Sequence, residues 1–213
     1  MELFDDPVET TPDISGIDIT SIFELSVDAY YTALYAQMSC KSIKREIAAF
    51  IEKVSRARNR DEADRAARDR GDSDVLTVLK EAGKVTCEIH RLRGMLRFSP
   101  ESDGVYTARC APDNFILPAL AEHFTLRFGE TPWAIIDEKR GLCLRKANGS
   151  EAVLIPFSPG LSGTAAEKAE KDSWEDMWRL YHKSINNESR RNPRLQRQFM
   201  PERYKKYLTE LKP

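Results

Sequence analysis

The sequence lacks the short motifs that mark the common nucleotide-dependent enzymes and hydrolases. It has no Gly-x-Ser-x-Gly nucleophile motif, no Walker loop and no dinucleotide glycine fingerprint. It also has no apolar run near the roughly 20 residues that cross a bilayer, and its first residues carry no basic signal region. These absences exclude the motif-bearing catalytic classes. They also predict a protein that does not bind membranes, for which the cytoplasm is the default location.

Cysteine pairs at metal-binding spacing are equally scarce. The four cysteines are widely and unevenly spaced, and no two of them form a C-x-x-C motif; they are Cys40, Cys87, Cys110 and Cys143. Such spacing is typical of reduced thiols and not of a disulfide framework. Cys87 and His90 form a single C-x-x-H pair, but no second pair accompanies it. We therefore expect neither a metal site nor another cofactor.

Positive charge is missing from the start of the chain. No lysine or arginine precedes Lys41, whereas acidic residues are frequent there, and the formal net charge of −1 hides this asymmetry. Basic residues collect between His90 and Arg97 and again after Arg190. This distribution suits a protein with one phosphate-facing surface. The alternative is that the acidic residues only keep a loose N-terminus in solution.

Hydrophobic periodicity in the first third predicts helices. A capping box at Ser21–Glu24 predicts a helix that buries one aromatic stripe, formed by Phe23, Val27, Tyr30, Leu34 and Met38. A second helix follows a break near Ser39, with Ile43, Ile47, Phe50, Ile51 and Val54 as its apolar residues. The charged residues 56–70 indicate a solvated helix that ends at Gly71, and Asp72 should cap a short helix that Gly83 stops.

The middle of the chain alternates between strand and helix patterns. Strands are expected at 95–98, 105–110, 133–137, 142–146 and 151–157, with an Asn148-Gly149 hairpin turn. Asn114 should cap a helix inserted between the second and third strands, with Phe115, Leu120, Phe124 and Phe128 on its core face. Helix resumes near Ala165, where Trp174, Met177, Trp178 and Tyr181 form an apolar side.

These patterns predict an α+β fold: N-terminal helices, a central antiparallel sheet of about five strands with an inserted helix, and a C-terminal helical segment. The expected division is a flexible acidic leader at 1–18, a helical region at 19–84 and an α+β domain at 85–213. The sequence does not predict the oligomeric state.

The C-terminal segment is the strongest candidate for a binding site. Four arginines fall within eight positions and are followed by Arg203; they are Arg190, Arg191, Arg194 and Arg197. Guanidinium groups suit phosphate oxygens, and the amides of Asn192, Gln196 and Gln198 can add base or sugar contacts. Pro193 and Pro201 should give the segment a fixed shape. The alternative is that the arginines brace the acidic N-terminus.

Further candidates lie before and within the expected sheet. If strand alternation begins near Arg93, Arg93 and Arg97 share one face, while Phe98 points to the other. Phe98 or Trp133 would be available to stack a base. The alternative is that both arginines form salt bridges to Glu88 or Asp137. Arg127 and Arg140 complete the set of candidate nucleic-acid contacts.

Histidine supplies the candidates for chemistry. His123 is the natural proton shuttle of the set, and Asp137 at a strand end could orient it, with His90 as a further candidate. A histidine beside Phe124 also fits a partly buried structural role. Catalysis is therefore an alternative to binding and not the leading prediction.

An ordered set of motifs supports the expectation of a DNA-related function. They include His90–Phe98, Asp103–Ala108, Pro112–Asn114, His123–Phe128, Trp133–Gly141, Arg191–Pro193 and Met200–Tyr204. Over about residues 85–210 the chain resembles a bacterial family of unknown function labelled as probable DNA-metabolism or DNA-repair proteins. Members of that family are found beside a radical-SAM protein or joined to a uracil-DNA-glycosylase-like domain.

The resemblance implies a DNA-binding protein that is accessory to a partner enzyme. An enzyme that acts on a nucleic-acid base, with His123 and Asp137 as its acid–base pair, is one alternative. A protein-interaction scaffold for a radical-SAM enzyme is the other. The family has no settled catalytic residues to assign to this chain.

Overall fold

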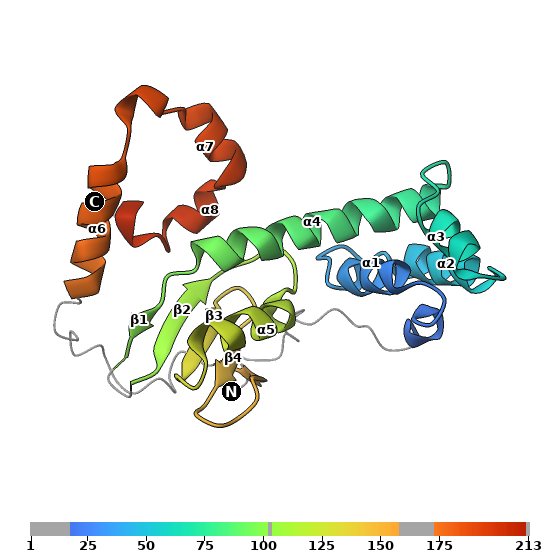
Figure 1. The fold of residues 1–213 in the computed structure, drawn as a ribbon, viewed down its shortest axis with the longest axis horizontal. Coiled ribbons are helices and arrows are strands. Elements are labelled where there is room, and N and C mark those ends of the chain that lie inside the picture. Colours follow the sequence, from blue (N-terminus) through green and yellow to red (C-terminus); the bar gives the residue numbers. More distant parts are fainter. Residues whose placement is uncertain (1–17, 102–103, 158–172, 212–213) are drawn as a thin grey trace, which may run out of the picture. The chain divides into compact units, whose positions relative to one another are not determined.

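The computed structural model describes residues 18–101, 104–157 and 173–211 (Figure 1). The chain divides into two compact units. The first consists of Met1–His90 with Asp113–Ile116, and the second of Arg91–Pro112 with Leu117–Pro213. Nearly all of the expected acidic leader lies outside the described residues. The division between the units falls within one helix, six residues after the expected end of the helical region.

The first unit is helical. It contains η1 (Thr20–Ile22), α1 (Val27–Gln37), α2 (Lys44–Ser55), α3 (Arg60–Ala67) and most of α4 (Ser73–Met95). The second of the expected helices is confirmed as α2, which buries Ile47, Phe50 and Val54 in the core of this unit. The solvated helix expected over 56–70 is shorter than predicted, because Asn59 caps α3 by accepting a hydrogen bond from the Glu62 amide at 2.9 Å.

Helix α1 buries a different face from the one predicted. Ser26 caps it by accepting from the Ala29 amide at 3.1 Å, so the helix begins after the predicted capping box. Its buried residues are Ala29, Ala33 and Ala36, while Phe23, Val27 and Tyr31 are 43%, 43% and 46% exposed. Of the predicted stripe, Tyr30 and Leu34 are half-buried against the core of this unit, so the prediction was right for these two residues and wrong for Phe23 and Val27. Small alanines are buried where α1 packs against α2 and α3.

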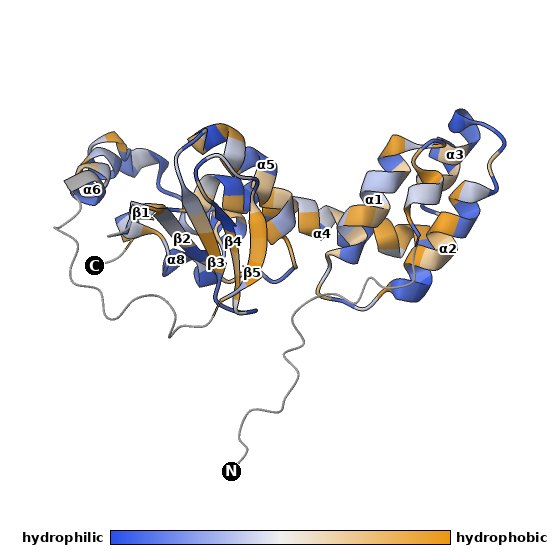
Figure 2. Ribbon diagram, turned by 90° about the horizontal axis from the view of Figure 1, so that it is seen from below, coloured by the Kyte–Doolittle hydropathy of each residue, from blue (hydrophilic) through white to orange (hydrophobic). Residues whose placement is uncertain are grey.

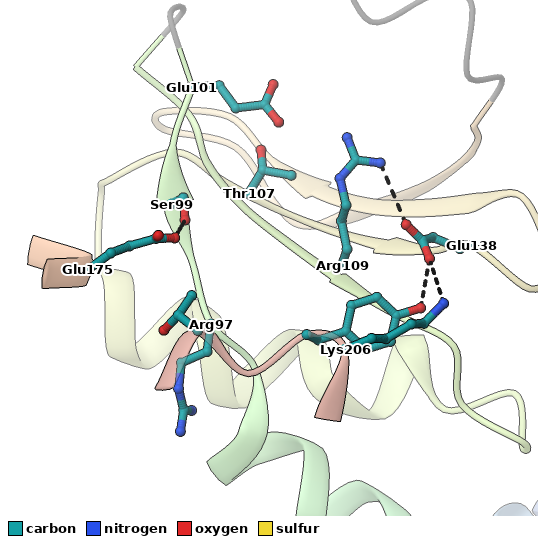
Figure 3. Close-up of a pocket in the computed structure, with 10 residues that line it drawn as sticks. Arg97, Ser99, Glu101, Thr107, Arg109, Glu138, Glu175 and Lys206 are labelled. Carbon is teal, nitrogen blue, oxygen red and sulfur yellow. Dashed lines mark hydrogen bonds and ion pairs between the residues drawn. The ribbon is translucent and has the colours of Figure 1, made fainter. Parts of the chain in front are cut away.

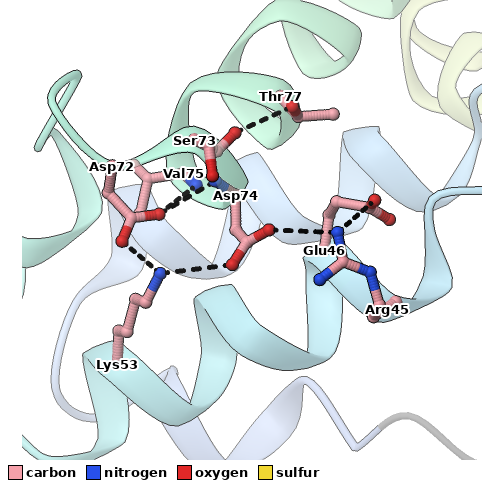
Figure 4. A network of polar contacts seen from close by, with 8 residues as sticks. All are labelled: Arg45, Glu46, Lys53, Asp72, Ser73, Asp74, Val75 and Thr77. Atoms are coloured by element: carbon pink, nitrogen blue, oxygen red, sulfur yellow. Dashed lines mark hydrogen bonds and ion pairs between the residues drawn. The ribbon is translucent and has the colours of Figure 1, made fainter.

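The start of α4 is fixed by a polar network (Figure 4). The Asp72 carboxylate accepts hydrogen bonds from the amides of Asp74 and Val75 at 2.9 and 3.0 Å, which satisfies two donors of the first turn. Lys53 of α2 forms ion pairs with the carboxylates of Asp72 and Asp74. The hydrogen bond to Lys53 contributes most to lowering the pKa of Asp72. This network ties α2 to the N-terminus of α4.

Helix α4 continues past the predicted stop at Gly83 to Met95. A Cβ atom at Gly83 would meet nothing within 4 Å, so this glycine lies on an open helix surface. A glycine there costs only about 1 kcal/mol relative to alanine, and burial of Val75, Val78 and Val85 outweighs it. Among the described residues, no helix is both long and apolar enough to cross a membrane.

Asn114 belongs to the first unit and does not cap a helix as predicted. The buried Glu88 carboxylate accepts from the amides of Asp113 and Asn114 at 2.9 Å each, and from the Asn114 side chain at 2.7 Å. The Asn114 side-chain oxygen in turn accepts from the Cys40 amide at 3.0 Å. These bonds hold residues 113–116 against α4 and the α1–α2 connection. The next helix begins only at Leu117.

The second unit is built on a five-stranded sheet in the order β1 (Ser99–Pro100), β2 (Tyr106–Cys110), β3 (Trp133–Asp137), β4 (Leu142–Lys146) and β5 (Val153–Pro156). The α+β class is confirmed, and β3 and β4 have the predicted bounds. The sheet is mixed, however, because β2 and β3 run parallel with α5 (Leu117–Phe128) crossing between them. The strand predicted at 95–98 was wrong, since α4 extends to Met95.

The two faces of the sheet carry different residues. On one face, Leu117, Leu120 and Phe124 of α5 are buried, and the Phe124 ring lies 6.1 Å from that of Trp133. The other face carries a small apolar cluster of Val105, Ala134, Ile136 and Cys143. Because strand side chains alternate, Thr107 and Arg109 of β2 point to this second face.

The C-terminal segment comprises α6 (Ser173–Ile185), η2 (Glu188–Arg190), α7 (Pro193–Phe199), α8 (Glu202–Lys205) and η3 (Thr209–Leu211). It is drawn in orange to red in Figure 1. Tyr204, Leu208 and Thr209 are buried and anchor it. The apolar side of α6 is not buried: its large exposed side chains are Met177, Trp178, Leu180, Tyr181 and Ile185.

Candidate nucleic-acid interface

The arginine-rich part of the C-terminal segment has a defined backbone shape. Asn192 precedes α7 and accepts a hydrogen bond from the Leu195 amide at 3.0 Å, which caps the helix. Pro193 occupies the first turn, where its missing amide hydrogen costs nothing. The helix ends at Phe199, two residues before Pro201. A proline thus lies at the start of α7 and another shortly after its end, as predicted.

The arginines of this segment face solvent. Arg190, Arg194 and Arg197 are exposed, and none forms an ion pair with a carboxylate in the described part of the chain. Arg197 donates only to the backbone oxygen of Pro193 at 3.3 Å, while Arg191 lies 3.7 Å from the Glu188 carboxylate. Gln196 and Gln198 are also exposed. Residues 190–198, which we call the arginine segment, therefore keep positive charge available to a polyanion.

Arg203 follows this segment but has an internal contact. Its guanidinium lies 4.7 Å from the ring centre of Tyr204 and donates to the hydroxyl of that tyrosine at 3.1 Å. The Tyr204 ring is buried, so this contact holds Arg203 beside the anchor of the C-terminal segment. Arg203 is a weaker candidate for phosphate binding than the exposed arginines before it.

Two predicted phosphate contacts are structural residues. Arg97 lies 2.6 Å from the Glu210 carboxylate and 5.3 Å from the ring centre of Trp178. The Arg140 side chain is only 9% exposed and pairs with Asp137 at 2.9 Å. Burial acts to raise the pKa of Glu210, but the bond from Arg97 contributes to a net lowering. Carboxylates of the protein neutralise Arg97 and Arg140, which favours a structural role for both, and their contact with phosphate stays a prediction.

Arg93, His123 and Arg127 form a separate group near the end of α4 and along α5. Arg93 is helical, so the strand alternation predicted to align it with Arg97 is wrong. It donates to the Ala119 carbonyl oxygen at 3.4 Å, while its buried Nε and the buried Nε2 of His123 have no partner among the described residues. Burial lowers the pKa of His123, and the charges of Arg93 and Arg127 lower it further. His123 is consequently neutral at neutral pH, and Arg127 is exposed.

The predicted acid–base pair of His123 and Asp137 is not formed. The Asp137 carboxylate is fully buried and accepts from the amides of Lys139 and Arg140, at 2.9 and 3.3 Å, as well as from the Arg140 guanidinium. It thus organises the β3–β4 turn and does not orient the histidine. His90, the third catalytic candidate, is exposed on α4 and belongs to the first unit.

Of the predicted stacking residues, Trp133 lies in the core and Phe98 is half-buried. The Trp133 side chain is 0% exposed, so it cannot stack a base in this structure. Phe98 packs against Phe124 and Phe128, with ring centres 5.0 and 4.8 Å apart. The sheet face that carries Trp133 is covered by α5, and base stacking on Phe98 stays a prediction. The aromatic side chains that are exposed in this unit include Trp178, Tyr181 and Phe199 of the C-terminal segment.

A polar pocket of about 450 Å³, which the sequence did not predict, lies on the second face of the sheet (Figure 3). Its walls come from the β1–β2 hairpin, the end of β3, the start of α6 and the end of the C-terminal segment. The lining residues are Arg97, Ser99, Glu101, Thr107, Arg109, Glu138, Glu175, Lys206, Tyr207 and Thr209. The alternation of side chains along β2 could have predicted that Thr107 and Arg109 point to the same face of the sheet. No sequence pattern predicts that Tyr207 lines the same pocket.

Glu138 is the polar centre of one wall of this pocket. Its carboxylate accepts from the Tyr207 hydroxyl at 2.7 Å and from Lys206 at 3.3 Å, and it lies 3.8 Å from Arg109. The Tyr207 hydrogen bond contributes most to lowering the pKa of Glu138. Burial, followed by the bond to Glu138, raises the pKa of Tyr207 well above its usual range. Tyr207 therefore stays protonated, and it fastens the C-terminal segment to the sheet.

Comparison with known proteins identifies the family. No curated protein and no solved structure matches the chain. A family model for a domain of unknown function, DUF4130, matches residues 41–210. The match begins well before residue 85, where the resemblance was expected to start, so α2, α3 and all of α4 lie within it. Because the model covers most of the sequence, the chain belongs to the DUF4130 family.

Proposed function

We propose that this protein binds DNA through the arginine segment and is accessory to a partner enzyme of DNA repair or base modification. The observation that carries the proposal is the state of Arg190, Arg194 and Arg197. These side chains are exposed and have no carboxylate partner among the described residues. The capped helix α7 presents Arg194 and Arg197, and Arg190 ends the short helix η2 before it. Guanidinium groups held in this way match phosphate oxygens.

Exposed aromatic residues extend this surface toward single-stranded DNA. Phe199 ends α7 and is 59% exposed, and Tyr181 of α6 is 53% exposed. Bases of a single strand can stack on such rings while arginines contact the backbone. This combination favours an interaction that depends on salt and tolerates many sequences.

The apolar side of α6 supports the accessory part of the proposal. Met177, Leu180 and Ile185 are exposed on a helix whose other residues are mostly charged or polar. Exposed apolar side chains at helical spacing are typical of helices that dock on another protein. The partner that the family resemblance suggests is a radical-SAM protein or a glycosylase, and α6 is the surface that we propose for it.

The test is titration of labelled single- and double-stranded DNA at increasing salt concentration. Each phosphate contact should contribute about 0.9 to the slope of log K against log salt for a duplex, and about 0.7 for a single strand. Replacing Arg190, Arg194 and Arg197 by alanine should therefore reduce the duplex slope by about 2.7. The urea midpoint should not change, because these residues make no ion pair that stabilises the fold.

A matched control is available in the first unit. Arg58, Arg60 and Arg70 are also exposed and have no carboxylate partner among the described residues. Replacing them by alanine removes three positive charges, as the first variant does, and both variants change the formal net charge from −1 to −4. The proposal requires a large loss of affinity in the arginine-segment variant and a small one in the control. Equal losses would mean that only net charge matters, and DNA binding independent of salt would overturn the proposal.

A further inference from the structure

We infer that the pocket on the second face of the sheet binds a nucleobase through its hydrogen-bonding edge, either in a free nucleoside or as a base extruded from DNA. This inference rests on the proposed function, because DNA is what would bring a base to the pocket. The pocket and the arginine segment belong to the same unit, and Lys206 and Tyr207 of the pocket follow that segment closely along the chain.

The charges of the pocket argue against phosphate as its ligand. Three basic side chains line it, and each faces a carboxylate. Arg97 pairs with Glu210, while Arg109 and Lys206 both face Glu138. Glu101 and Glu175 add further negative charge to the walls. A phosphate would have to displace these contacts and approach the carboxylates, so a neutral polar molecule fits this lining better than an anion.

The pocket offers hydrogen-bonding groups that the protein itself does not use. Among the described residues, no hydrogen bond or ion pair involves the Thr107 hydroxyl or the Glu101 carboxylate. The Arg109 side chain is 45% exposed, and the contact of its guanidinium with Glu138 is long at 3.8 Å. Figure 3 shows these three side chains next to one another along the β1–β2 hairpin. Together they present one carboxylate acceptor, one hydroxyl and several guanidinium donors, which match the mixed donor and acceptor edge of a base.

Shape supports a planar ligand. The Arg109 guanidinium lies 5.9 Å from the ring centre of Phe157, so two flat groups are already placed near each other beside the pocket. Bases stack on guanidinium planes as well as on aromatic rings. The volume of about 450 Å³ lies within the usual range for small-molecule sites, which is about 300 to 1,000 Å³. A single nucleoside therefore fits, whereas a duplex does not.

The experiment compares three duplexes that are identical except at one position. The first has a bulged 2-aminopurine, the second an abasic bulge, and the third is fully paired. Wild-type protein should bind the bulged base about tenfold more tightly than the abasic bulge. Binding should also change the fluorescence of 2-aminopurine. Titration with free deoxynucleosides, and separately with inorganic phosphate, distinguishes a base from an anion as the bound group.

Two substitutions should remove the preference for a base without disturbing the fold. Thr107→Val keeps the branched shape that suits a strand, and Glu101→Gln removes one charge from the pocket wall. Each should lower the preference for the bulged base about threefold to tenfold, as expected for one lost hydrogen bond. Thr125→Val is the matched control, since Thr125 is also half-buried in this unit but does not line the pocket. Alanine at Arg190, Arg194 and Arg197 should weaken binding of all three duplexes alike.

The outcomes separate this inference from the proposed function. If wild-type protein binds the bulged and abasic duplexes equally through the arginine segment, the inference is overturned and the proposed function stands. If free nucleosides bind but no DNA does, the pocket is a nucleoside site and the proposed function fails. If phosphate competes at the pocket as well as nucleosides do, the argument from charge is wrong.

Discussion

Replacing Arg140 tests whether this residue supports the fold or contacts DNA. Arg140 was a candidate for phosphate binding on sequence grounds, but its guanidinium is buried and donates to Asp137 at 2.9 Å and to the Pro112 carbonyl oxygen at 3.1 Å. We predict that Arg140→Met destabilises the second unit strongly. The substitution keeps most of the side-chain volume and removes the charge that neutralises a fully buried carboxylate.

The magnitude follows from what remains around Asp137. Breaking a buried ion pair by removing one partner costs about 3 to 5 kcal/mol. The Asp137 carboxylate keeps its bonds from the amides of Lys139 and Arg140, so we expect the lower end of this range, about 3 kcal/mol. For a unit of this size that corresponds to a fall in Tm of roughly 10 °C. Adding Asp137→Asn should restore part of the loss, because the uncompensated charge is then absent.

Tryptophan fluorescence can follow this unit selectively, since Trp133, Trp174 and Trp178 all belong to it. Urea unfolding of both single variants and the double variant gives the coupling energy between the two residues. The arginine-segment variant is the control, as it should weaken DNA binding at unchanged stability. If Arg140→Met keeps the wild-type urea midpoint but loses DNA affinity, the structural role assigned to Arg140 is refuted.

Three smaller perturbations test other parts of the structure. Gly141→Ala should destabilise the β3–β4 turn by about 1 to 2 kcal/mol, because Gly141 has φ +60° and a Cβ atom there would lie 3.3 Å from the Phe157 carbonyl oxygen; an unchanged urea midpoint would contradict this. Gly83→Ala, by contrast, should stabilise α4 by up to about 1 kcal/mol, because a Cβ atom there would meet nothing within 4 Å. Thermal unfolding followed by circular dichroism measures this gain in stability. A loss of stability would contradict the prediction. Tyr207→Phe should make stability less dependent on pH at both extremes. The lowered pKa of Glu138 gives stability that is present above its ordinary pKa of 4.5 and is lost as pH falls below it, whereas the raised pKa of Tyr207 gives stability that is lost as pH rises above 10.0. Identical pH profiles for the wild type and this variant would show that the bond contributes nothing.

Local sequence patterns predicted correctly those helices and strands that are determined by residues close together in the sequence. Strands β3 and β4 have the predicted bounds, because each is a short apolar run between clear turn residues. Helix α2 was predicted correctly for a similar reason, since Ile47, Phe50 and Val54 recur at helical spacing. The prediction for α1 was right only in part, because its fully buried residues are alanines while Tyr30 and Leu34 are half-buried. The prediction for α4 failed because tertiary packing outweighed local preference, and Gly83 does not end that helix.

The candidate site was predicted only in part because its contacts are remote in sequence. The exposed arginine segment was visible as a cluster of like residues. The pairing of Arg97 with Glu210 joins residues 113 positions apart, and that of Tyr207 with Glu138 joins residues 69 positions apart. No periodicity encodes such pairs. The same limit applies to Asp137, whose partner lies only three positions away, because burial and not spacing decides that the pair is structural.

The position of β5 at one edge of the sheet has a consequence for handling the protein. Its outer amide and carbonyl groups pair with no strand in the part of the chain that the structure describes, and Val153, Leu154 and Ile155 are exposed. Figure 2 shows β5 in the orange of hydrophobic residues. An open apolar edge is a template on which another copy can add a strand. Pro156 has no amide hydrogen, so it limits this template to a few residues. Concentrated samples should therefore aggregate in part through β5, and a lysine in place of Leu154 should improve solubility.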